Sequence, residues 1–331
     1  MTNPKLALIP SGYKGGTNPT VYSILPNDAS GDFDFSRASE GTRVRKDGLI
    51  EEVADNVPRL DWLNSNCPSL LLEPTKANYA LNSGDASQWA TVGGSQLVTK
   101  TQNYAISPDG TLTAARIQAN AIGSNYSLIQ LSTSSFVGNY AGSVYLKSNT
   151  GNIENVIVYG RNTPVNSYSI GNEWQRVEIQ GSGISGQNLY LFLGSFPNNG
   201  SDENVDVLVW GGQLEQNYTT SYIKTEASAV TRLKDECFNG GDADLFDITE
   251  GTFFVDSYVY NSGNFTTISL SDGSVSNRLI LIFQNYGTQV RVLSSGGVDS
   301  FLNLTFDQRN KIAVTFKENE YKFFINGALV G

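Results

Sequence analysis

Short runs of alternating apolar and polar residues follow one another through most of the chain, separated by clusters of turn-forming residues. A period of two places successive side chains on opposite sides of a strand, as in a sheet with one buried face. No long window has the 3.6-residue period of an amphipathic helix. The clearest runs of the middle segment are 141–147, 155–159, 174–179, 189–193 and 205–210. Residues 76–226 are therefore predicted to form a β-sandwich.

A second series of strand patterns follows a short connector over residues 225–234. Its runs are 251–260, 265–270, 278–283, 289–293, 311–316 and 321–325. Asn326 and Gly327 then give the signal of a type I′ turn, which normally begins a return strand. Only four residues follow that turn. The pattern predicts a second sandwich over residues 227–331 that is cut short, and a sequence that is a fragment of a longer chain or its ordered part.

Residues 1–75 have a different character, because they contain seven of the ten prolines of the chain. Proline removes a backbone donor and discourages regular sheet or helix. One hairpin is predicted within this arm, over residues 42–53, with its turn at Asp47 and Gly48. Such an arm cannot bury much surface by itself. It is expected to pack on another subunit or on its own next domain.

Four basic residues lie in and before this hairpin. They are Arg37, Arg43, Arg45 and Lys46. Glu51, Glu52 and Asp55 lie opposite them, so cross-strand ion pairing is one explanation. Docking of the basic residues on an acidic partner surface is the other.

Composition narrows the possible functions. The 331 residues suggest about two domains, and charged residues are only 16% of the chain against roughly 25% in ordinary domains. The net charge of −10 argues against nucleic-acid binding. The chain has no histidine, which excludes Ser-His-Asp and Cys-His catalysis as well as His metal ligands.

Cysteine usage and apolar runs add two further exclusions. Cys67 and Cys237 lie far apart without a CxxC spacing, so we predict two buried, unpaired thiols and no zinc site or disulfide framework. The first residues contain no apolar stretch of signal-peptide length, and the longest apolar run, 279–283, is far too short to span a bilayer. The sequence predicts a soluble protein that is not inserted in a membrane.

Several short segments, taken in order, resemble one class of proteins. The segments FSRAS (35–39), DGLIE (47–51), NVPRLD (56–61) and CPSLLLEP (67–74) resemble the amino-terminal region of bacteriophage virion fibre and adsorption proteins, including those of crAss-like phages. SPDGT (107–111), WGGQLE (210–215) and SYIKT (221–225) resemble strands of the carbohydrate-binding-module-like jelly roll found in those proteins. EGTF (250–253) and residues 321–330 resemble a partial laminin-G or concanavalin-like jelly roll.

This resemblance implies an all-β virion component, in which an extended N-terminal arm is followed by two jelly-roll β-sandwiches, the second incomplete. The arm would anchor to capsid, portal or tail proteins, and the sandwiches would project outward and bind host-surface glycans. The protein is expected to be a homotrimer that is assembled in the cytoplasm of a bacterial host. In the virion it would form a head or tail fibre. The resemblance carries over no catalytic residues.

An alternative is a polysaccharide-degrading tailspike whose catalytic domain lies beyond residue 331. A glycosidase needs two facing carboxylates, but Glu203 and Asp206, like Glu173 and Glu178, are separated by an odd number of residues. Each pair would therefore point to opposite faces of a continuous strand. We predict that this segment is not an enzyme.

Two sets of candidate site residues remain. Sugar binding needs aromatic platforms and planar amides, and Tyr126, Asn166 and Tyr168 lie in turn-rich stretches where exposed contacts are expected. Most other aromatic residues of this segment are expected to pack in the core or on a sheet. A glycine-rich loop carries Asp242, Asp244 and Asp247, whose carboxylates suit a calcium ion as a cofactor. The alternative is that they form a solvated acidic turn.

Overall fold

The chain folds into two compact units in the computed structural model, and one of them combines two distant stretches of sequence. Phe35–Glu236 form the first, here called the continuous unit, and Met1–Asp34 with Cys237–Gly331 form the second, the split unit. The structure describes residues 7–8, 21–22, 33–63, 66–93, 97–123, 125–136, 138–182, 187–240, 249–259, 266–284, 288–305, 308–318 and 320–331. In this part of the chain no helix is long and apolar enough to cross a membrane.

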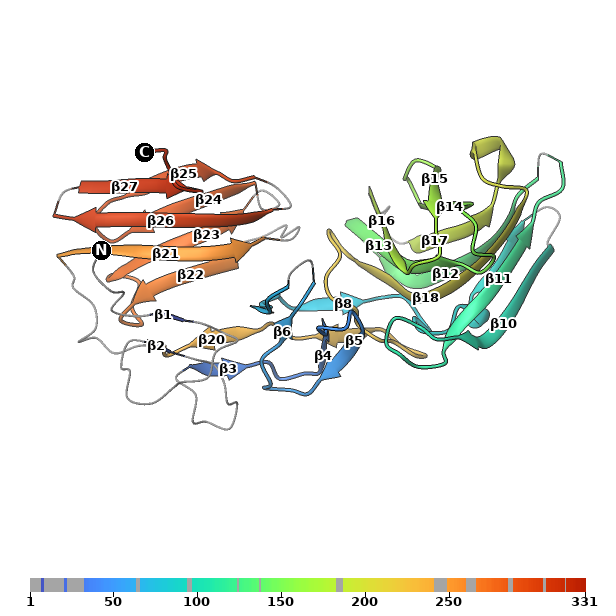
Figure 1. The fold of residues 1–331 in the computed structure, drawn as a ribbon, viewed down its shortest axis with the longest axis horizontal. Helices are drawn as coiled ribbons and strands as arrows, with labels where there is room; N and C mark the ends of the chain where they lie inside the picture. The colour runs from blue at the N-terminus through green and yellow to red at the C-terminus, as the bar shows by residue number, and fades with distance from the viewer. Residues whose placement is uncertain are drawn as a thin grey trace. The chain divides into compact units, whose positions relative to one another are not determined.

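The continuous unit is a sandwich of two five-stranded antiparallel sheets (Figure 1). The β18 sheet contains, in spatial order, β10 (Leu97–Ala105), β11 (Ala114–Asn120), β18 (Asn204–Gln216), β13 (Asn139–Ser148) and β16 (Gln175–Ser182). The β17 sheet contains β15 (Asn166–Ile170), β14 (Glu154–Gly160), β17 (Gln187–Ser195), β12 (Ser127–Phe136) and β9 (Ala90–Gly93). Four of the five predicted strand runs fall within β13, β14, β17 and β18, and the run 174–179 begins one residue before β16.

The core of this unit lies between the two sheets, where the alternation places the aliphatic side chains. Leu191 and Leu193 of β17 and Val207 and Val209 of β18 have no exposed surface. They belong to one cluster with residues such as Ile117, Ile129, Leu131, Val144, Leu146, Val156 and Val158. Burial at about 25 cal/mol per Å² of apolar surface makes this core the main source of stability of the unit.

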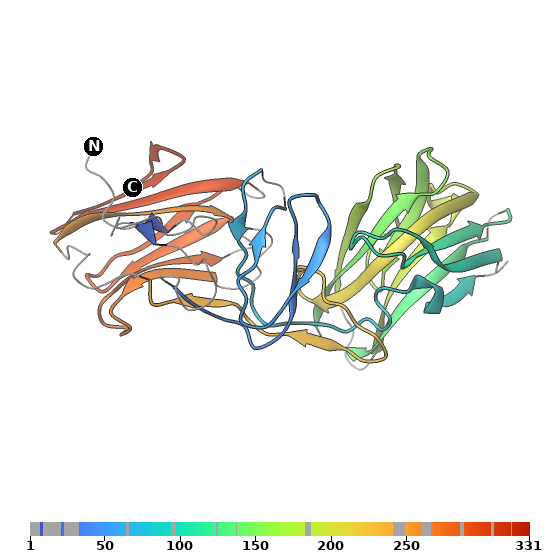
Figure 2. The same ribbon diagram turned by 60° about the horizontal axis from the view of Figure 1, so that its bottom comes forward.

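Residues 35–75 belong to the continuous unit rather than to a separate arm of residues 1–75. The predicted hairpin is confirmed as β4 (Gly41–Val44) paired with β5 (Ile50–Val53), drawn in blue in Figure 2, and Gly48 has the positive φ of 84° that its turn needs. Ile50 lies in a small buried cluster with Trp210 and Tyr222. The described residues of 35–75 therefore pack on the domain that follows them, one of the two arrangements expected.

Short pairings complete the continuous unit. They are β6 (Leu60–Asp61) with β7 (Ser69–Leu70), and β8 (Lys76–Asn78) with β19 (Val230–Arg232). Its described residues also form the 3-10 turns η1 (Ala86–Gln88) and η2 (Pro197–Asn199). Because β19 lies after residue 226, the end of the unit also differs from the predicted boundary, and Glu236 is its last residue. The chain leaves one unit for the other at β3 (Asp34–Ser36) and β20 (Glu236–Phe238).

The split unit is a sandwich of two four-stranded antiparallel sheets. The β26 sheet contains β21 (Glu250–Tyr258), β26 (Arg309–Lys317), β27 (Glu320–Ile325) and β28 (Ala328–Leu329), and the β24 sheet contains β22 (Thr266–Ser271), β23 (Arg278–Gln284), β24 (Gln289–Ser294) and β25 (Asp299–Asn303). Its other described strands are β1 (Ala7–Leu8) and β2 (Val21–Tyr22), which pair in parallel.

The turn at Asn326 and Gly327 has the predicted geometry, whereas the two cysteines differ from their predicted state. Asn326 and Gly327 have φ values of 50° and 87°, as a type I′ turn requires, and β28 returns along β27. The sheets of the two units confirm the predicted all-β class with jelly-roll sandwiches. The expectation of two buried thiols is wrong for Cys67, which is exposed, whereas Cys237 is half-buried.

Candidate functional site

Five aromatic side chains gather on the outer face of the β17 sheet. Leu191 and Leu193 point into the core, so Tyr190 and Phe192 point outward from the same strand. Cross-strand pairing places further aromatic residues on that side. We call this set the aromatic face: Tyr126, Tyr159, Tyr190, Phe192 and Phe196.

The rings of the aromatic face contact one another in two groups, one of three rings and one of two. Phe192 pairs in register with Tyr159 of β14 and Gln130 of β12, which gives a row across three strands. The rings of Tyr159 and Phe192 are stacked at 4.8 Å and 20°, and Tyr190 lies 5.6 Å from Phe192. Tyr126 contacts Phe196 with ring centres 5.3 Å apart. Tyr126 is 37% exposed and the other four rings are half-buried.

The sheet beneath these rings is unusually apolar for an outer face. Leu128 and Ile157 point to the same side as Phe192 yet have no exposed surface, and both pair with Gly194. A Cβ on Gly194, whose φ is 143°, would lie 2.4 Å from the Ser127 carbonyl oxygen. Glycine at this position therefore keeps β12 and β17 together, while the surrounding side chains cover Leu128 and Ile157.

Loop hydrogen bonds fix one end of the aromatic face. The backbone N–H of Phe196 donates to Ser201 Oγ at 2.5 Å, and Ser167 Oγ donates to the Gly200 carbonyl at 3.0 Å. Asn155 donates to Asp202 from its backbone N–H at 2.7 Å and from its side chain at 3.2 Å. The loop that carries Phe196 is thereby attached to β14 and β15, and the Phe196 ring is held in place.

Arg161 lies at the other end of the face, with its guanidinium carbon 6.0 Å from the centre of the Tyr190 ring. It is presented by a tight turn, in which Asn162 has a φ of 57° and Gly160 N donates to Thr163 Oγ1 at 2.7 Å. Tyr140 Oη donates to the Arg161 carbonyl. Hydrogen bonds therefore position both ends of the aromatic face, which favours a preformed binding surface.

The hydroxyl of Tyr159 stays protonated across the physiological range. Burial raises the pKa of Tyr159 above its usual value of 10.0, and neighbouring Tyr126 raises it further. A protonated phenol can both donate and accept a hydrogen bond. Together with the Gln130 amide, it gives the face polar groups beside its apolar rings.

The three residues expected to bind sugar do not lie together. Tyr126 is part of the aromatic face. Asn166 and Tyr168 of β15 pair with Val158 and Val156, whose side chains point into the core, so they lie on the other side of the sheet. Tyr168 packs against that core, and Asn166 is exposed where β15 begins.

Four members of the aromatic face were missed from the sequence. Tyr159, Tyr190 and Phe192 lie inside strand runs, where packing is the usual role, and Phe196 lies in the loop after the run that carries Phe192. The signal available was the alternation of aromatic and aliphatic residues in 190–193, Tyr-Leu-Phe-Leu. Among the other aromatic residues of the segment, most of which are expected to pack in the core or on a sheet, Trp210 is buried, and Trp174 is half-buried against the Trp210 cluster.

The predicted anchoring residues separate into a buried one and three on the hairpin. Arg43 pairs with Glu51 across the strands at 2.6 Å, and Arg45 pairs with Asp47 at 2.5 Å. The ion pairs of the hairpin are therefore present, and Lys46 is exposed. Arg37 is only 1% exposed, so it lacks the exposure that contact with an acidic partner surface would require.

Arg37 is one of three buried arginines that, with two carboxylates, form the arginine cluster: Arg37, Arg59, Arg232, Glu73 and Asp235. Arg37 and Arg59 bind different oxygens of Asp235, the former at 3.0 Å. Arg59 and Arg232 both contact Glu73 Oε2, at 2.8 and 2.5 Å. The side chains of the three arginines are at most 1% exposed, so each charge depends on these partners.

Backbone carbonyls complete the arginine cluster. Arg37 donates to the carbonyls of Val53 and Ala54 at 3.1 and 2.6 Å. Arg59 donates to the Thr42 carbonyl at 2.9 Å, and Arg232 to the Pro74 carbonyl at 2.8 Å. The cluster therefore holds residues 37–74 against residues 232–235.

The pKa of Glu73 makes the stability of the continuous unit depend on pH. Burial alone would raise this pKa, but the charges of Arg232 and Arg59 outweigh burial and hold it at about 2, against an ordinary 4.5. A carboxyl with a lowered folded-state pKa contributes stability above its unfolded-state pKa and loses it as pH falls. We expect up to about 3 kcal/mol of unfolding free energy to be lost between pH 4.5 and 2.

Urea unfolding followed by tryptophan fluorescence measures this loss, because all four tryptophans, Trp62, Trp89, Trp174 and Trp210, belong to the continuous unit. A Glu73→Gln variant serves as the control, since its stability should change less with pH in that window. A wild-type unfolding free energy that stays constant down to pH 2.5 would contradict the expectation.

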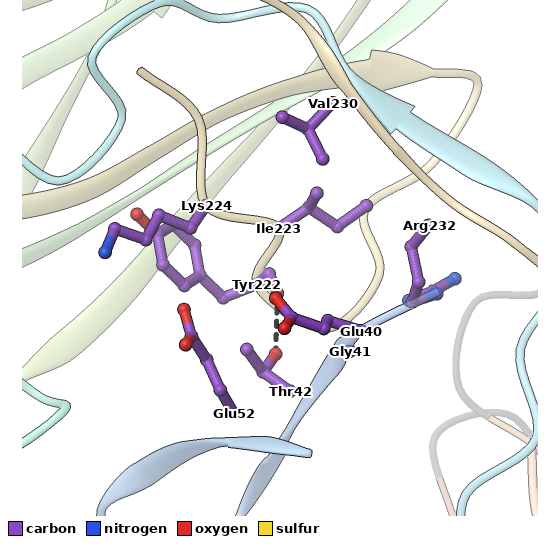
Figure 3. Close-up of a pocket in the computed structure, with 9 residues that line it drawn as sticks. All are labelled: Glu40, Gly41, Thr42, Glu52, Tyr222, Ile223, Lys224, Val230 and Arg232. Atoms are coloured by element: carbon purple, nitrogen blue, oxygen red, sulfur yellow. Dashed lines mark hydrogen bonds between the residues drawn. The ribbon is translucent and has the colours of Figure 1, made fainter. Parts of the chain in front are cut away.

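A small cavity lies beside the arginine cluster, within the continuous unit. Its volume is about 60 Å³, and its lining, shown in Figure 3, comes from residues 40–52 and 222–232. The Thr42 hydroxyl donates to the Tyr222 carbonyl at 2.6 Å across it. Pockets for small molecules measure about 300–1,000 Å³, so this cavity has room for water and not for a sugar.

The predicted calcium loop lies outside the described residues, since Asp242, Asp244 and Asp247 fall in the segment 241–248. Among the residues that are described, no group of three or more Cys, Asp or Glu side chains is arranged to hold a metal ion.

Comparison with known proteins gives only distant structural likenesses. No protein-family model and no curated protein matches the sequence. One similar solved structure is the CBM22-1–GH10 part of Clostridium thermocellum xylanase 10B with xylohexaose, which is 13% identical with a TM-score of 0.31. The match covers 46% of this chain and 30% of that one.

Two isolated carbohydrate-binding structures also match. The TmCBM61 module with β-1,4-galactotriose is 17% identical, with a TM-score of 0.28 over 41% of this chain and 97% of that one. A CBM22 tandem from Paenibacillus barcinonensis Xyn10C is 14% identical, with a TM-score of 0.29 over 76% of this chain and 83% of that one. Likenesses at this level leave the function to be inferred from the residues of this chain.

Proposed function

We propose that this chain is a glycan-binding adsorption protein of a phage virion, and that the aromatic face is its glycan-binding site. The observation that carries the proposal is the set of contacting rings on an outer sheet face. Aromatic rings on such a face are partly exposed at a cost, because apolar surface is normally buried. A ligand that covers them recovers that free energy.

A pyranose suits this surface better than other small ligands. Its ring presents an apolar C–H face, which stacks on an aromatic ring, and a rim of hydroxyls, which needs planar hydrogen-bonding groups. Phe192 and Tyr159 provide the platform, and the Gln130 amide lies beside it in the same row. The Tyr159 hydroxyl and the Arg161 guanidinium can reach ligand hydroxyls at either side.

The virion location rests on the order of short segments that resembles phage fibre and adsorption proteins. The hairpin residues Arg43, which is half-buried, and Arg45 and Lys46, which are exposed, remain the proposed contacts with other virion proteins, without Arg37. A homotrimer is part of the same proposal. A virion reconstruction in which this chain occupies head or tail fibre density supports it, and absence of the chain from purified virions contradicts it.

Replacing Phe192 with alanine is expected to weaken glycan binding about tenfold, because a central buried aromatic contact typically contributes more than 1 kcal/mol. Affinity electrophoresis of the full chain in gels containing neutral polysaccharides measures the effect. Tyr104→Ala is the matched control, since this tyrosine is 43% exposed on β10 of the other sheet and should not affect binding. Unchanged tryptophan fluorescence shows that each variant is folded.

Equal retardation of Phe192→Ala and the wild type on every retained polysaccharide would place the binding site elsewhere. Failure of the wild type to bind any glycan would contradict the proposed function itself.

A further inference from the structure

The split unit carries a face of different chemistry, on the outer side of the β24 sheet. Core residues of this sheet include Leu281, Phe283, Val290, Val292 and Leu302, so the residues between them point outward. Cross-strand register aligns three outward amides in one row across three strands. We call this row and the residues beside it the amide face: Gln284, Gln289, Asn303, Arg291, Phe301 and Asp299.

The amide row follows directly from the pairing. Gln284 of β23 lies opposite Gln289 of β24, which lies opposite Asn303 of β25. The Gln284 amide nitrogen donates to Gln289 Oε1 at 2.8 Å, so the two planar groups are oriented by each other. A side-chain amide has both donors and acceptors, which matches the donor and acceptor character of sugar hydroxyls.

An aromatic platform lies in the next row. Phe301 pairs in register with Arg291 and is 54% exposed, which is high for a phenylalanine. The Arg291 guanidinium carbon lies 5.3 Å from the centre of the Phe301 ring. Asp299 accepts two hydrogen bonds from Arg291, at 2.7 and 2.6 Å, and thereby fixes the plane of the guanidinium.

The charge of the amide face indicates a neutral ligand. Arg291 and Asp299 neutralise each other, and the one other charged residue at an outward position on the four described strands of this sheet is Arg278, at the end of β23 away from the amide row. The outer face of the β26 sheet is different, since charged residues surround its exposed Phe254. They include Glu250, Asp256, Arg309, Lys311, Lys317, Glu320 and Lys322. The two faces of one unit thus differ in the ligand chemistry they suit.

We propose that the amide face is a second glycan-binding site, which takes a neutral oligosaccharide with a sugar ring stacked on Phe301. The amides of the adjacent row hydrogen-bond its hydroxyls, and the Arg291–Asp299 pair provides a fixed donor and acceptor at the edge of the ring. This site lies in the split unit and does not depend on the aromatic face. A chain with both sites would hold a surface polysaccharide at two points, which strengthens attachment without new contacts.

Hydrogen exchange of the full chain with millimolar neutral oligosaccharides tests the proposal, using xylohexaose, cellohexaose, laminarihexaose, maltohexaose and β-1,4-galactotriose in turn. We expect at least one of them to slow exchange in peptides covering 278–303. Binding at the aromatic face would appear separately, in peptides covering 126–131, 155–160 and 190–196. The two sites are therefore tested independently in one experiment.

In Phe301→Ala, we expect that about tenfold more ligand is needed to give the same protection of residues 278–303 from hydrogen exchange. Phe254→Ala is its matched control, since this phenylalanine is 56% exposed on the outer face of the other sheet. Asn303→Ala, an exposed substitution, is a second test variant if Phe301→Ala alters exchange in the free protein. Absence of protection with all five sugars, or protection unchanged in both test variants, overturns the proposal.

Discussion

Replacing Arg59 with methionine is expected to lower the free energy of unfolding of the continuous unit by about 3–5 kcal/mol. The Arg59 side chain has no exposed surface, and it contacts both carboxylates of the arginine cluster. Its removal leaves Glu73 and Asp235 buried with fewer positive charges. Methionine fills similar space, so the loss reports the charge and not a cavity.

Urea unfolding followed by tryptophan fluorescence measures this change in the full chain. Arg43→Met is the control, because the Arg43–Glu51 pair is partly exposed and should contribute no more than about 1 kcal/mol. A buried arginine can also impose a cost, since Arg59 Nε has no hydrogen-bond partner within the described part of the chain. An Arg59→Met unfolding midpoint at or above that of the wild type would show that this cost dominates.

A fragment of residues 35–236 is expected to fold alone, whereas a fragment of residues 76–226 is not. The shorter fragment lacks all five members of the arginine cluster, which are Arg37, Arg59, Glu73, Arg232 and Asp235. It also lacks Ile50, which covers Trp210 and Tyr222. A typical domain is stabilised by only about 5–15 kcal/mol, so the combined loss of a buried ionic network and of apolar cover is a large fraction of that stability.

Expression of both fragments and fluorescence-monitored unfolding test this expectation. The longer fragment should show the cooperative transition of the full chain, and the shorter one should be insoluble or lack a transition. Equal midpoints for the two fragments would mean that residues 35–75 and 227–236 do not stabilise the sandwich. Glycan-binding work on an isolated domain therefore calls for residues 35–236.

The strands could be predicted because their signal is local. Alternation within 189–193 or 205–210 fixes a strand from its own residues, and Asn326 with Gly327 fixes a turn from two. The division of the chain could not be predicted in this way. Arg37 lies in a proline-rich, charged stretch that looks solvated, and its carboxylate partner Asp235 is 198 residues away.

The aromatic face could not be predicted from the sequence for a related reason. In 155–159 the outward Ile157 is as apolar as the inward Val156 and Val158, so the run does not reveal which side faces the core. Only the pairing of β14 with β17 decides that Tyr159 points outward beside Phe192. Tyr126 was found because it precedes a strand, where exposure is the usual state of a side chain.

The ion pair between Arg37 and Asp235 also has a mechanical consequence. These residues are the third from the beginning and the second from the end of the continuous unit, so the pair joins its two ends. Tension applied to the chain on both sides of the unit reaches this junction before it reaches the sheets. The sandwich, with its aromatic face, is thereby shielded from load for as long as the junction holds.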